Sequence, residues 1–325
     1  METGALRYIF GPVLSGRLGR SLGLDLLGRR VCTMNCVYCE SGKLETLTLD
    51  RAAYVPAAVV LGELERWDQG RKDRGEPLPD AATLGGLGEP TLNVDMPEII
   101  AGIRRILPGV PVAVLTNASL MSDPAVRAEL ARADMILPSM DSLVPEEFRA
   151  VNRAHPGLDP NAIADGILRF RKDYQSRMYL EILLAAGIND SARNLELLAA
   201  FCKELQPDRV DVVTLSRPGT ESFARPVDAE TLARWRGRLC SLARPRNGLA
   251  GAAEKGQKHA GAFRPDDLES SILASLARRP QTAAQLAAAL LAPEDQVRGV
   301  VMRLAEHGRI AAGPGEPAYY RRAQA

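Results

Sequence analysis

Three of the five cysteines lie between residues 32 and 39, in the stretch CTMNCVYC. Cys32, Cys36 and Cys39 form a C-x3-C-x2-C pattern, for which disulfide, zinc and iron–sulfur chemistry compete. The odd cysteine count, the clustering and the lack of a secretion signal disfavour a disulfide framework. Three thiolates are one ligand short of a structural zinc site or of a [4Fe–4S] cluster held wholly by protein. We therefore expect a metal centre with one position open to a small molecule, and zinc and iron–sulfur remain alternatives.

Composition sets the protein class. The 325 residues are 46% hydrophobic and 25% charged, which is typical of a soluble globular protein. The net charge is +1, so bulk electrostatics indicates neither a nucleic acid nor a membrane as partner. We find no signal-peptide pattern and no apolar run near the roughly 20 residues of a membrane span. We expect a cytoplasmic protein that does not contact the membrane.

The cysteine stretch must be positioned by the elements around it. Apolar runs that predict buried strands alternate with helical patterns, and the strands are expected at 22–27, 82–87, 110–116, 134–139, 178–186 and 209–215. Such an alternation predicts a parallel sheet covered on both faces. Six units are too few for an eight-stranded barrel. The predicted fold is α/β, a partial (β/α)6 TIM-type barrel, with function at the carboxyl ends of its strands.

The amino-acid composition changes after about residue 244, where Gly, Ala and basic residues become frequent. We divide it into a barrel at 1–230, a basic Gly/Ala-rich linker at 231–265 and a C-terminal domain at 266–325. The last domain has three helical patterns, which begin near 266, 281 and 293, followed by two short strands around a Gly/Pro tip. Three helices and a hairpin resemble a small winged helix-turn-helix module.

A second motif follows the second predicted strand, where the sequence reads GGLGEPTLN at 85–93. Taken alone this is an ordinary Gly/Pro turn between a strand and a helix. Together with C-x3-C-x2-C after the first strand, it resembles the radical S-adenosylmethionine (SAM) superfamily. The resemblance implies that the three thiolates hold a [4Fe–4S] cluster and that the amino and carboxylate groups of SAM chelate its fourth iron. An electron then splits SAM into methionine and a 5′-deoxyadenosyl radical.

The resemblance also assigns roles to single residues. The strand end at Gly86, Leu87, Gly88 and Glu89 is expected to bind the amino group of SAM, since glycine permits close backbone approach and an ammonium needs acceptors. The remaining expected SAM contacts are Asn117 and Ser139 at the methionine carboxylate or ribose, and Tyr38, Ile182 and Leu215 at the adenine. Asp141, Arg17 and Arg20 are expected near the substrate. For each residue a turn, cap, packing or surface role is the alternative.

Further segments, among them YIFGPVLSGRLGRSLGLDLL, TNASL, PSMDS and VNRAHPGL, resemble one branch of the superfamily over about residues 8–225. That branch is related to the wyosine-type tRNA-modifying enzymes. Those enzymes carry a second cluster, but only Cys202 and Cys240 remain here, and Cys202 lies on an apolar helix face. We therefore expect no second cluster. Methylating relatives need two additional active-site cysteines, so the final reaction stays open.

Partners follow from the resemblance and from charge. The family implies an external electron donor of flavodoxin or ferredoxin type, with an RNA base as the first substrate candidate and a protein or peptide as the second.

A strip at 231–264 has eight Lys/Arg against one acidic residue and could contact phosphates, or be a solvated linker. Residues 266–322 balance seven Arg with seven acidic residues, which favours docking to a protein or to the open side of the barrel over DNA binding. The alternative function is an iron–sulfur or SAM-dependent regulator that uses the winged helix. His259 and His307 receive no role.

Overall fold

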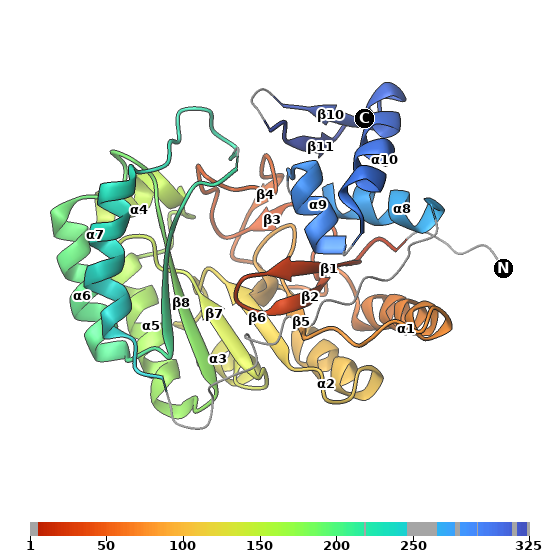
Figure 1. Ribbon diagram of the computed structural model, residues 1–325. Helices are drawn as coiled ribbons and strands as arrows, with labels where there is room; N and C mark the ends of the chain where they lie inside the picture. Colours follow the sequence, from red (N-terminus) through yellow and green to blue (C-terminus); the bar gives the residue numbers. More distant parts are fainter. Residues whose placement is uncertain are drawn as a thin grey trace.

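The large sheet contains six parallel strands, and the cysteine stretch and the glycine motif lie at the carboxyl ends of these strands (Figure 1). The computed structural model describes residues 6–217, 219–245, 265–276, 280–290, 292–313 and 317–323. The parallel strands are β2 (Gly19–Leu24), β5 (Ala81–Leu84), β6 (Val112–Thr116), β7 (Met135–Pro138), β8 (Arg177–Leu184) and β9 (Arg209–Thr214), in that spatial order. All six were predicted from their apolar runs, and the first lies about three residues earlier than expected.

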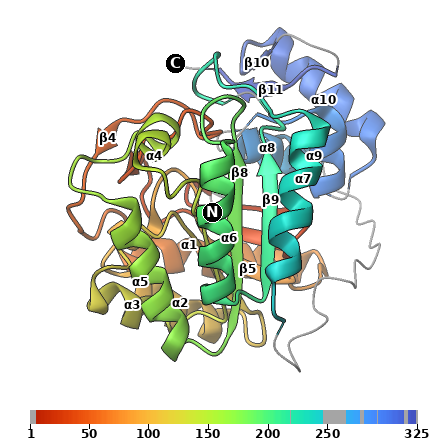
Figure 2. The ribbon, with the colours of Figure 1, turned by 90° about the vertical axis from the view of Figure 1, so that its left-hand side faces the viewer.

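Helices pack against one face of this sheet, in contrast to the predicted cover on both faces. They are α1 (Ala57–Asp73), α2 (Met96–Ile106), α3 (Pro124–Leu130), α5 (Pro160–Asp173), α6 (Ala192–Leu205) and α7 (Ala229–Leu239). Figure 2 views α5, α6 and α7 from outside the sheet. The strands and these helices share one large buried core, whereas a small cluster around Ala81, Ala113 and Met135 covers the other face. The second face is therefore left partly open.

Helix starts follow local sequence rules. Asp123, Asp159 and Ser191 cap α3, α5 and α6, because each side chain accepts a hydrogen bond from a backbone N–H in the first turn. Apolar residues at helical spacing then face the sheet, as Val60, Leu64 and Trp67 do in α1. These expected helices are confirmed.

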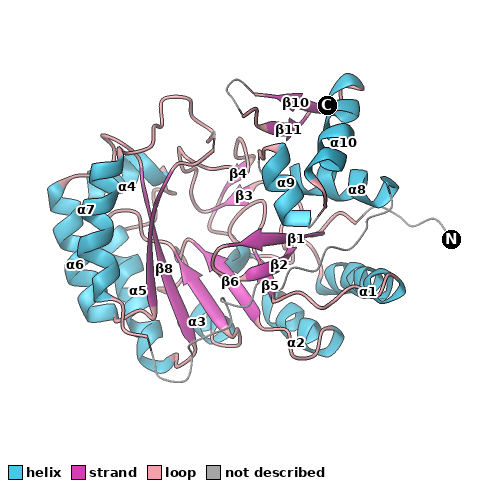
Figure 3. Cartoon of the chain, in the orientation of Figure 1, coloured by secondary structure: helices cyan, strands magenta, loops and turns pink. Residues whose placement is uncertain are grey.

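The sequence did not predict strand β1 (Ile9–Ser15), which pairs antiparallel with β2 at the edge of the sheet (Figure 3). Its register shifts between Phe10 and Val13, at the Gly11-Pro12 pair. A Pro in a strand interferes with ladder hydrogen bonds and is tolerated at edges and bulges, so the sequence does not look like a strand. Helix α4 (Pro145–Asn152), the 3-10 turn η1 (Pro90–Leu92) and the short parallel pair β3 (Val31–Cys32) and β4 (Thr46–Leu47) were also not predicted.

Helix α7 corrects the predicted domain boundary at residue 230. Trp235 and Leu239 are fully buried in the core that the sheet shares with its helices. The helix continues into the short turn η2 (Cys240–Leu242), and Cys240 Sγ lies 3.2 Å from the Val210 carbonyl oxygen. Residues 231–242 are therefore part of the first unit and not of a linker.

The C-terminal part has a core of its own. It contains α8 (Pro265–Leu276), α9 (Ala283–Leu290), α10 (Glu294–Glu306) and the antiparallel strands β10 (Ile310–Ala312) and β11 (Tyr320–Arg322). Gln281 adds a bridge to Tyr320 through two backbone hydrogen bonds of 3.0 and 2.8 Å. Helices α8 and α9 pack against β1, so this part covers the edge of the large sheet. Among the described residues no helix is long and apolar enough to cross a membrane.

Candidate functional site

The cysteine stretch lies at the carboxyl ends of the parallel strands, directly after β2. Backbone hydrogen bonds hold it against the end of α4, from Asn35 N to Asn152 O (3.0 Å) and from Val37 N to Val151 O (2.9 Å). Cys39 N also donates to Cys36 O at 3.1 Å, which forms a tight turn between the last two cysteines. The sequence expectation that the triad follows the first parallel strand is met.

Burial keeps two of the thiols protonated in the absence of a metal. Burial, together with the nearby Glu89 carboxylate, raises the pKa of Cys32 to about 12. Burial likewise raises the pKa of Cys36 well above its usual value, and Asp141 adds to the effect. Only the thiolate binds a metal, so a positively charged centre must displace these protons when it binds.

The surroundings of the thiols fit an iron–sulfur cluster. Asn117 Nδ2 lies 3.5 Å from Cys32 Sγ and Asn152 Nδ2 lies 3.4 Å from Cys36 Sγ, so side-chain amides face two of the sulfurs. Hydrogen bonds to sulfur are a usual feature of protein-bound clusters. Within the described part of the chain no three Cys, His, Asp or Glu side chains are grouped around one metal-ion position. Cysteines that each bind a different iron of a cluster need no such grouping.

The glycine motif packs against the start of the cysteine stretch. A Cβ on Gly88 would lie 1.7 Å from the Val31 carbonyl oxygen, so only glycine permits this approach. Glu89 N donates to the same oxygen at 3.2 Å, and Ser41 Oγ donates to Gly86 O at 3.2 Å. The structure thus brings together two motifs that are about 50 residues apart in the sequence.

Glu89 is almost fully buried, and its carboxylate is occupied by the protein itself. It accepts hydrogen bonds from Thr91 N (3.2 Å), Thr91 Oγ1 (2.7 Å), Thr116 Oγ1 (2.7 Å) and Asn117 N (2.7 Å). Burial raises the pKa of Glu89, while these hydrogen bonds oppose that rise. The carboxylate therefore fixes the ends of β5 and β6 relative to each other, and its expected contact with SAM stays a prediction.

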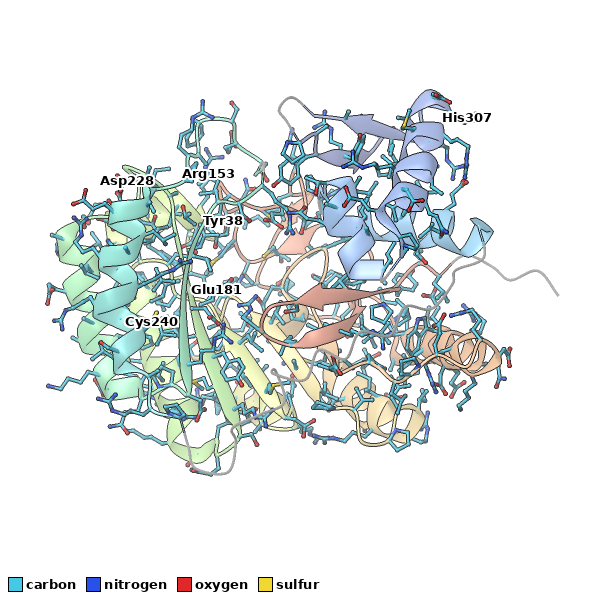
Figure 4. The ribbon with its side chains drawn as sticks, in the orientation of Figure 1. Tyr38, Arg153, Glu181, Asp228, Cys240 and His307 are labelled. Carbon is cyan, nitrogen blue, oxygen red and sulfur yellow. The ribbon has the colours of Figure 1, made fainter. Side chains whose placement is uncertain are left out.

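Asp141 is the centre of a second buried network, after the end of β7. Its carboxylate accepts hydrogen bonds from the Tyr38 hydroxyl, from Asn152 Nδ2 at 2.7 Å and from Leu183 N at 2.9 Å. Burial raises the pKa of Asp141 in spite of these donors. The network ties the cysteine stretch to β7, β8 and α4, and Figure 4 shows Tyr38 near the end of β8.

A small cavity of about 50 Å³ lies between these networks. Its lining includes four residues that the sequence predicted for the site, Tyr38, Asn117, Ser139 and Asp141, and one that it did not, Asn152. Asn152 Oδ1 is buried and has no hydrogen-bond partner in the described structure. The sequence offered no signal for Asn152 beyond the motif VNRAHPGL, because helix α4 was not predicted.

Two predicted residues point away from the site. Ile182 is fully buried in the core between the sheet and its helices, because buried and partly exposed residues alternate along β8. Its neighbours Glu181 and Leu183 face the other side. Arg20 lies near the amino end of β2, on the same face as Leu22 and Leu24, which are buried toward the helices, so its side chain is directed away from the cysteines. Both expectations are corrected.

Two others lie where the site can use them. Leu215 packs in a small cluster with Val37 and Tyr38, at the end of β9. Arg17, in the turn between β1 and β2, reaches across the open face of the sheet and forms an ion pair with Glu181. Figure 4 shows Glu181 on β8, farther from the carboxyl end of the strand than Tyr38. Arg17 therefore lies on the face of the sheet opposite the helices, closer to the amino ends of the strands than the cysteine stretch.

The loop after β9 covers the last cysteine. Thr220 Oγ1 donates to Cys39 O at 2.8 Å, and Glu221 N donates to Val37 O at 3.1 Å. Arg217 pairs with Glu40 at 3.1 Å and also lies 3.4 Å from Gln285 of α9. This loop connects the cysteine stretch to the C-terminal part.

Residues 231–245, the described part of the predicted basic strip, extend away from this end of the sheet. Figure 4 places Asp228, at the start of α7, on the side of Arg153, and Cys240 toward the opposite side. Arg236 donates to Val212 O at 2.9 Å and Arg238 pairs with Glu196 at 3.0 Å. Four further basic residues of the strip and one histidine lie outside the described residues, namely Arg246, Lys255, Lys258, Arg264 and His259.

Comparison with known proteins agrees with this geometry. The UPF0026 protein of Helicobacter pylori is 38% identical over 67% of this chain and 68% of its own length. The protein named GTPase Obg of Brachyspira hyodysenteriae is 28% identical over 94% of this chain, and the chain spans 43% of that protein. The dual-specificity RNA methyltransferase RlmN of Phenylobacterium zucineum is 24% identical over 63% of this chain and 54% of its own length.

The family model named Radical SAM superfamily matches residues 29–199, more than half of the chain. The match begins before Cys32 and ends within α6, so it includes the cysteine stretch, the glycine motif and the Asp141 network. Members of this superfamily are enzymes that use a [4Fe–4S] cluster and SAM and take electrons from an external donor. The chain belongs to the radical SAM superfamily.

Proposed function

We propose that this enzyme cleaves SAM reductively at a [4Fe–4S] cluster bound by Cys32, Cys36 and Cys39. The observation that carries the proposal is the packing of the glycine motif on the cysteine stretch, with Gly88 against Val31. When bound, the cluster supplies the electron that divides SAM into methionine and a 5′-deoxyadenosyl radical. The chain's own residues hold the two reactants together and limit the access of water.

The roles proposed for single residues follow from their positions. The Gly86 carbonyl accepts from Ser41 Oγ at 3.2 Å, just after the cysteine stretch, and we propose that this carbonyl and that of Leu87 accept from the SAM ammonium. Asn117 and Ser139 line the cavity beside it and offer polar contacts to the carboxylate or ribose. Tyr38 presents its ring, because its hydroxyl is already bonded to Asp141, and we propose that the ring packs on the adenine.

We propose an RNA base as the substrate. The similarity to RlmN and to the wyosine-type branch supports this class, although no second cluster is available among the cysteines. At the rim, Phe223 is 54% exposed, and the Arg153 guanidinium lies 5.6 Å from the centre of its ring. An exposed aromatic ring with a neighbouring arginine is a suitable platform on which a base can stack. The electron donor proposed for the reaction is of flavodoxin or ferredoxin type.

A second candidate function is regulation through the C-terminal part, which we propose is a winged helix-turn-helix domain. The order of three helices and an antiparallel hairpin supports this assignment. The contact from Gln285 through Arg217 to Glu40 supports communication with the cysteine stretch. A regulator would bind nucleic acid or protein in response to the cluster's state without forming 5′-deoxyadenosine.

The decisive experiment is anaerobic reconstitution followed by an assay for 5′-deoxyadenosine with dithionite. Alanine variants of Cys32, Cys36 and Cys39 should lose iron, colour and product, whereas Cys240→Ala should keep all three. Addition of RNA or peptide pools should stimulate turnover for the correct substrate class. Bound iron without any 5′-deoxyadenosine would favour the regulator, and iron retained in the triad variants would refute these ligands. Stimulation by peptides alone would exclude the RNA substrate.

A further inference from the structure

The Asn152 side chain uses both of its N–H groups at the site. It is 3% exposed, donates to Asp141 Oδ2 at 2.7 Å and lies 3.4 Å from Cys36 Sγ. Its Oδ1 atom has no partner among the described residues, although it is buried. An unsatisfied buried oxygen costs free energy, so packing alone does not explain an amide at this position.

Asn117 makes a matching contact on the other side of the cysteine stretch. Its Nδ2 atom donates to Thr33 Oγ1 at 2.9 Å and lies 3.5 Å from Cys32 Sγ. Its Oδ1 accepts from Ser119 N at 3.1 Å, and its backbone N–H donates to Glu89 at 2.7 Å. In each amide one N–H group is held by an oxygen, which is Asp141 Oδ2 for Asn152 and Thr33 Oγ1 for Asn117. The other N–H group is then directed toward the cysteine sulfur.

We propose that Asn152 and Asn117 are positioning residues that donate N–H···S hydrogen bonds to Cys36 and Cys32 and thereby raise the reduction potential of the cluster. This inference rests on the proposed function, since it takes the two cysteines as ligands. Reduction adds negative charge, part of which resides on the sulfurs, and a hydrogen bond to a sulfur stabilises the reduced form more than the oxidised form. The potential must therefore fall when either donor is removed.

The two contacts act on different sulfurs and have different neighbours, which makes them independent. Loss of one donor should shift the reduction equilibrium about tenfold, which corresponds to about 59 mV for a one-electron couple. Loss of both should give roughly the sum. Among the other residues that line the cavity, Asn117 alone has a side-chain N–H group, and that amide already faces Cys32.

The test uses Asn152→Ala and Asn117→Ala in the reconstituted full-length protein, with the midpoint potential measured by dithionite titration and EPR. Two variants serve as matched controls. Asn194→Ala removes a buried amide that donates to the Asp141 carbonyl at 3.0 Å, and Ser119→Ala removes a hydroxyl 2.7 Å from Thr33 Oγ1. Neither side chain is hydrogen-bonded to a cysteine sulfur in the described structure, so both controls should keep the wild-type potential.

The expected result is a lower potential in both test variants at unchanged iron content. Wild-type potentials in both, with iron bound, would overturn the inference and leave the proposed function standing. An equal fall in the controls would also overturn it, because the effect would then come from disturbed packing. If Asn152→Ala does not fold, Asn117→Ala carries the test on the opposite sulfur. A wild-type protein that binds no iron would instead refute the proposed function.

Discussion

Substitution by alanine should lower stability and iron binding at one glycine of the glycine motif and leave both nearly unchanged at another. At Gly88 the added methyl would lie 1.7 Å from Val31 O and 2.7 Å from Val31 C, both backbone atoms that cannot rotate away. At Gly85 the nearest atom would be Leu115 Cβ at 3.5 Å, which is ordinary van der Waals contact. Gly88→Ala must therefore move the end of β5 away from the cysteine stretch, and Gly85→Ala need not.

The size of the effect can be worked out from these contacts. Val31 and residue 88 must separate by more than about 1 Å, and overpacking of this kind costs about 1–3 kcal/mol. The movement also breaks the 3.2 Å hydrogen bond from Glu89 N to Val31 O, which contributes about 1 kcal/mol. For a chain of 325 residues, a total of about 3 kcal/mol should lower the melting temperature by roughly 4–5 °C. Gly85→Ala should change it by less than about 2 °C.

The assay compares both variants in thermal unfolding and in iron bound after anaerobic reconstitution. Gly88→Ala should also bind less iron, because Val31 directly precedes Cys32 and a shift of one displaces the other. Gly85→Ala should bind as much as the wild type. Equal melting temperatures and equal iron contents in the two variants would show that the close packing of the two motifs does not position the cysteines.

Further predictions concern three other contacts. Tyr38→Phe should destabilise the protein by about 1 kcal/mol in urea, because Asp141 loses one donor, while SAM affinity by calorimetry stays unchanged. Burial raises the pKa of Glu181 above its usual 4.5, so the folded state binds that proton more tightly and stability falls as pH rises from 4.5 through the raised pKa. Glu181→Gln should weaken that fall in urea unfolding, and an unchanged pH profile would contradict it. Arg217→Ala should speed cluster loss in air several-fold without a change in melting temperature.

The sequence predicted those elements whose pattern depends on burial. Each parallel strand contains an apolar run because helices cover one of its faces, and all of these strands except β9 also pair with a strand on both sides. The sequence missed β1 because Gly11-Pro12 interrupts it at a bulge. It missed α7 because a basic composition masked a stripe in which Trp235 and Leu239 are fully buried. That stripe has helical spacing and was a usable signal.

Prediction of the site was limited by a different cause. Cys32 and Gly88 belong to local motifs, so their roles can be inferred from spacing. Asn152 lies in the segment VNRAHPGL, but nothing in the spacing of that segment indicates its proposed role, which arises only when the end of α4 meets the cysteine stretch through the hydrogen bond from Asn35 N to Asn152 O. Ile182 was wrongly expected at the adenine, because a position near the end of a strand does not tell which face of the sheet the side chain occupies. The residues proposed to bind the cofactor can thus be found by spacing, whereas those proposed to adjust its chemistry depend on long-range packing.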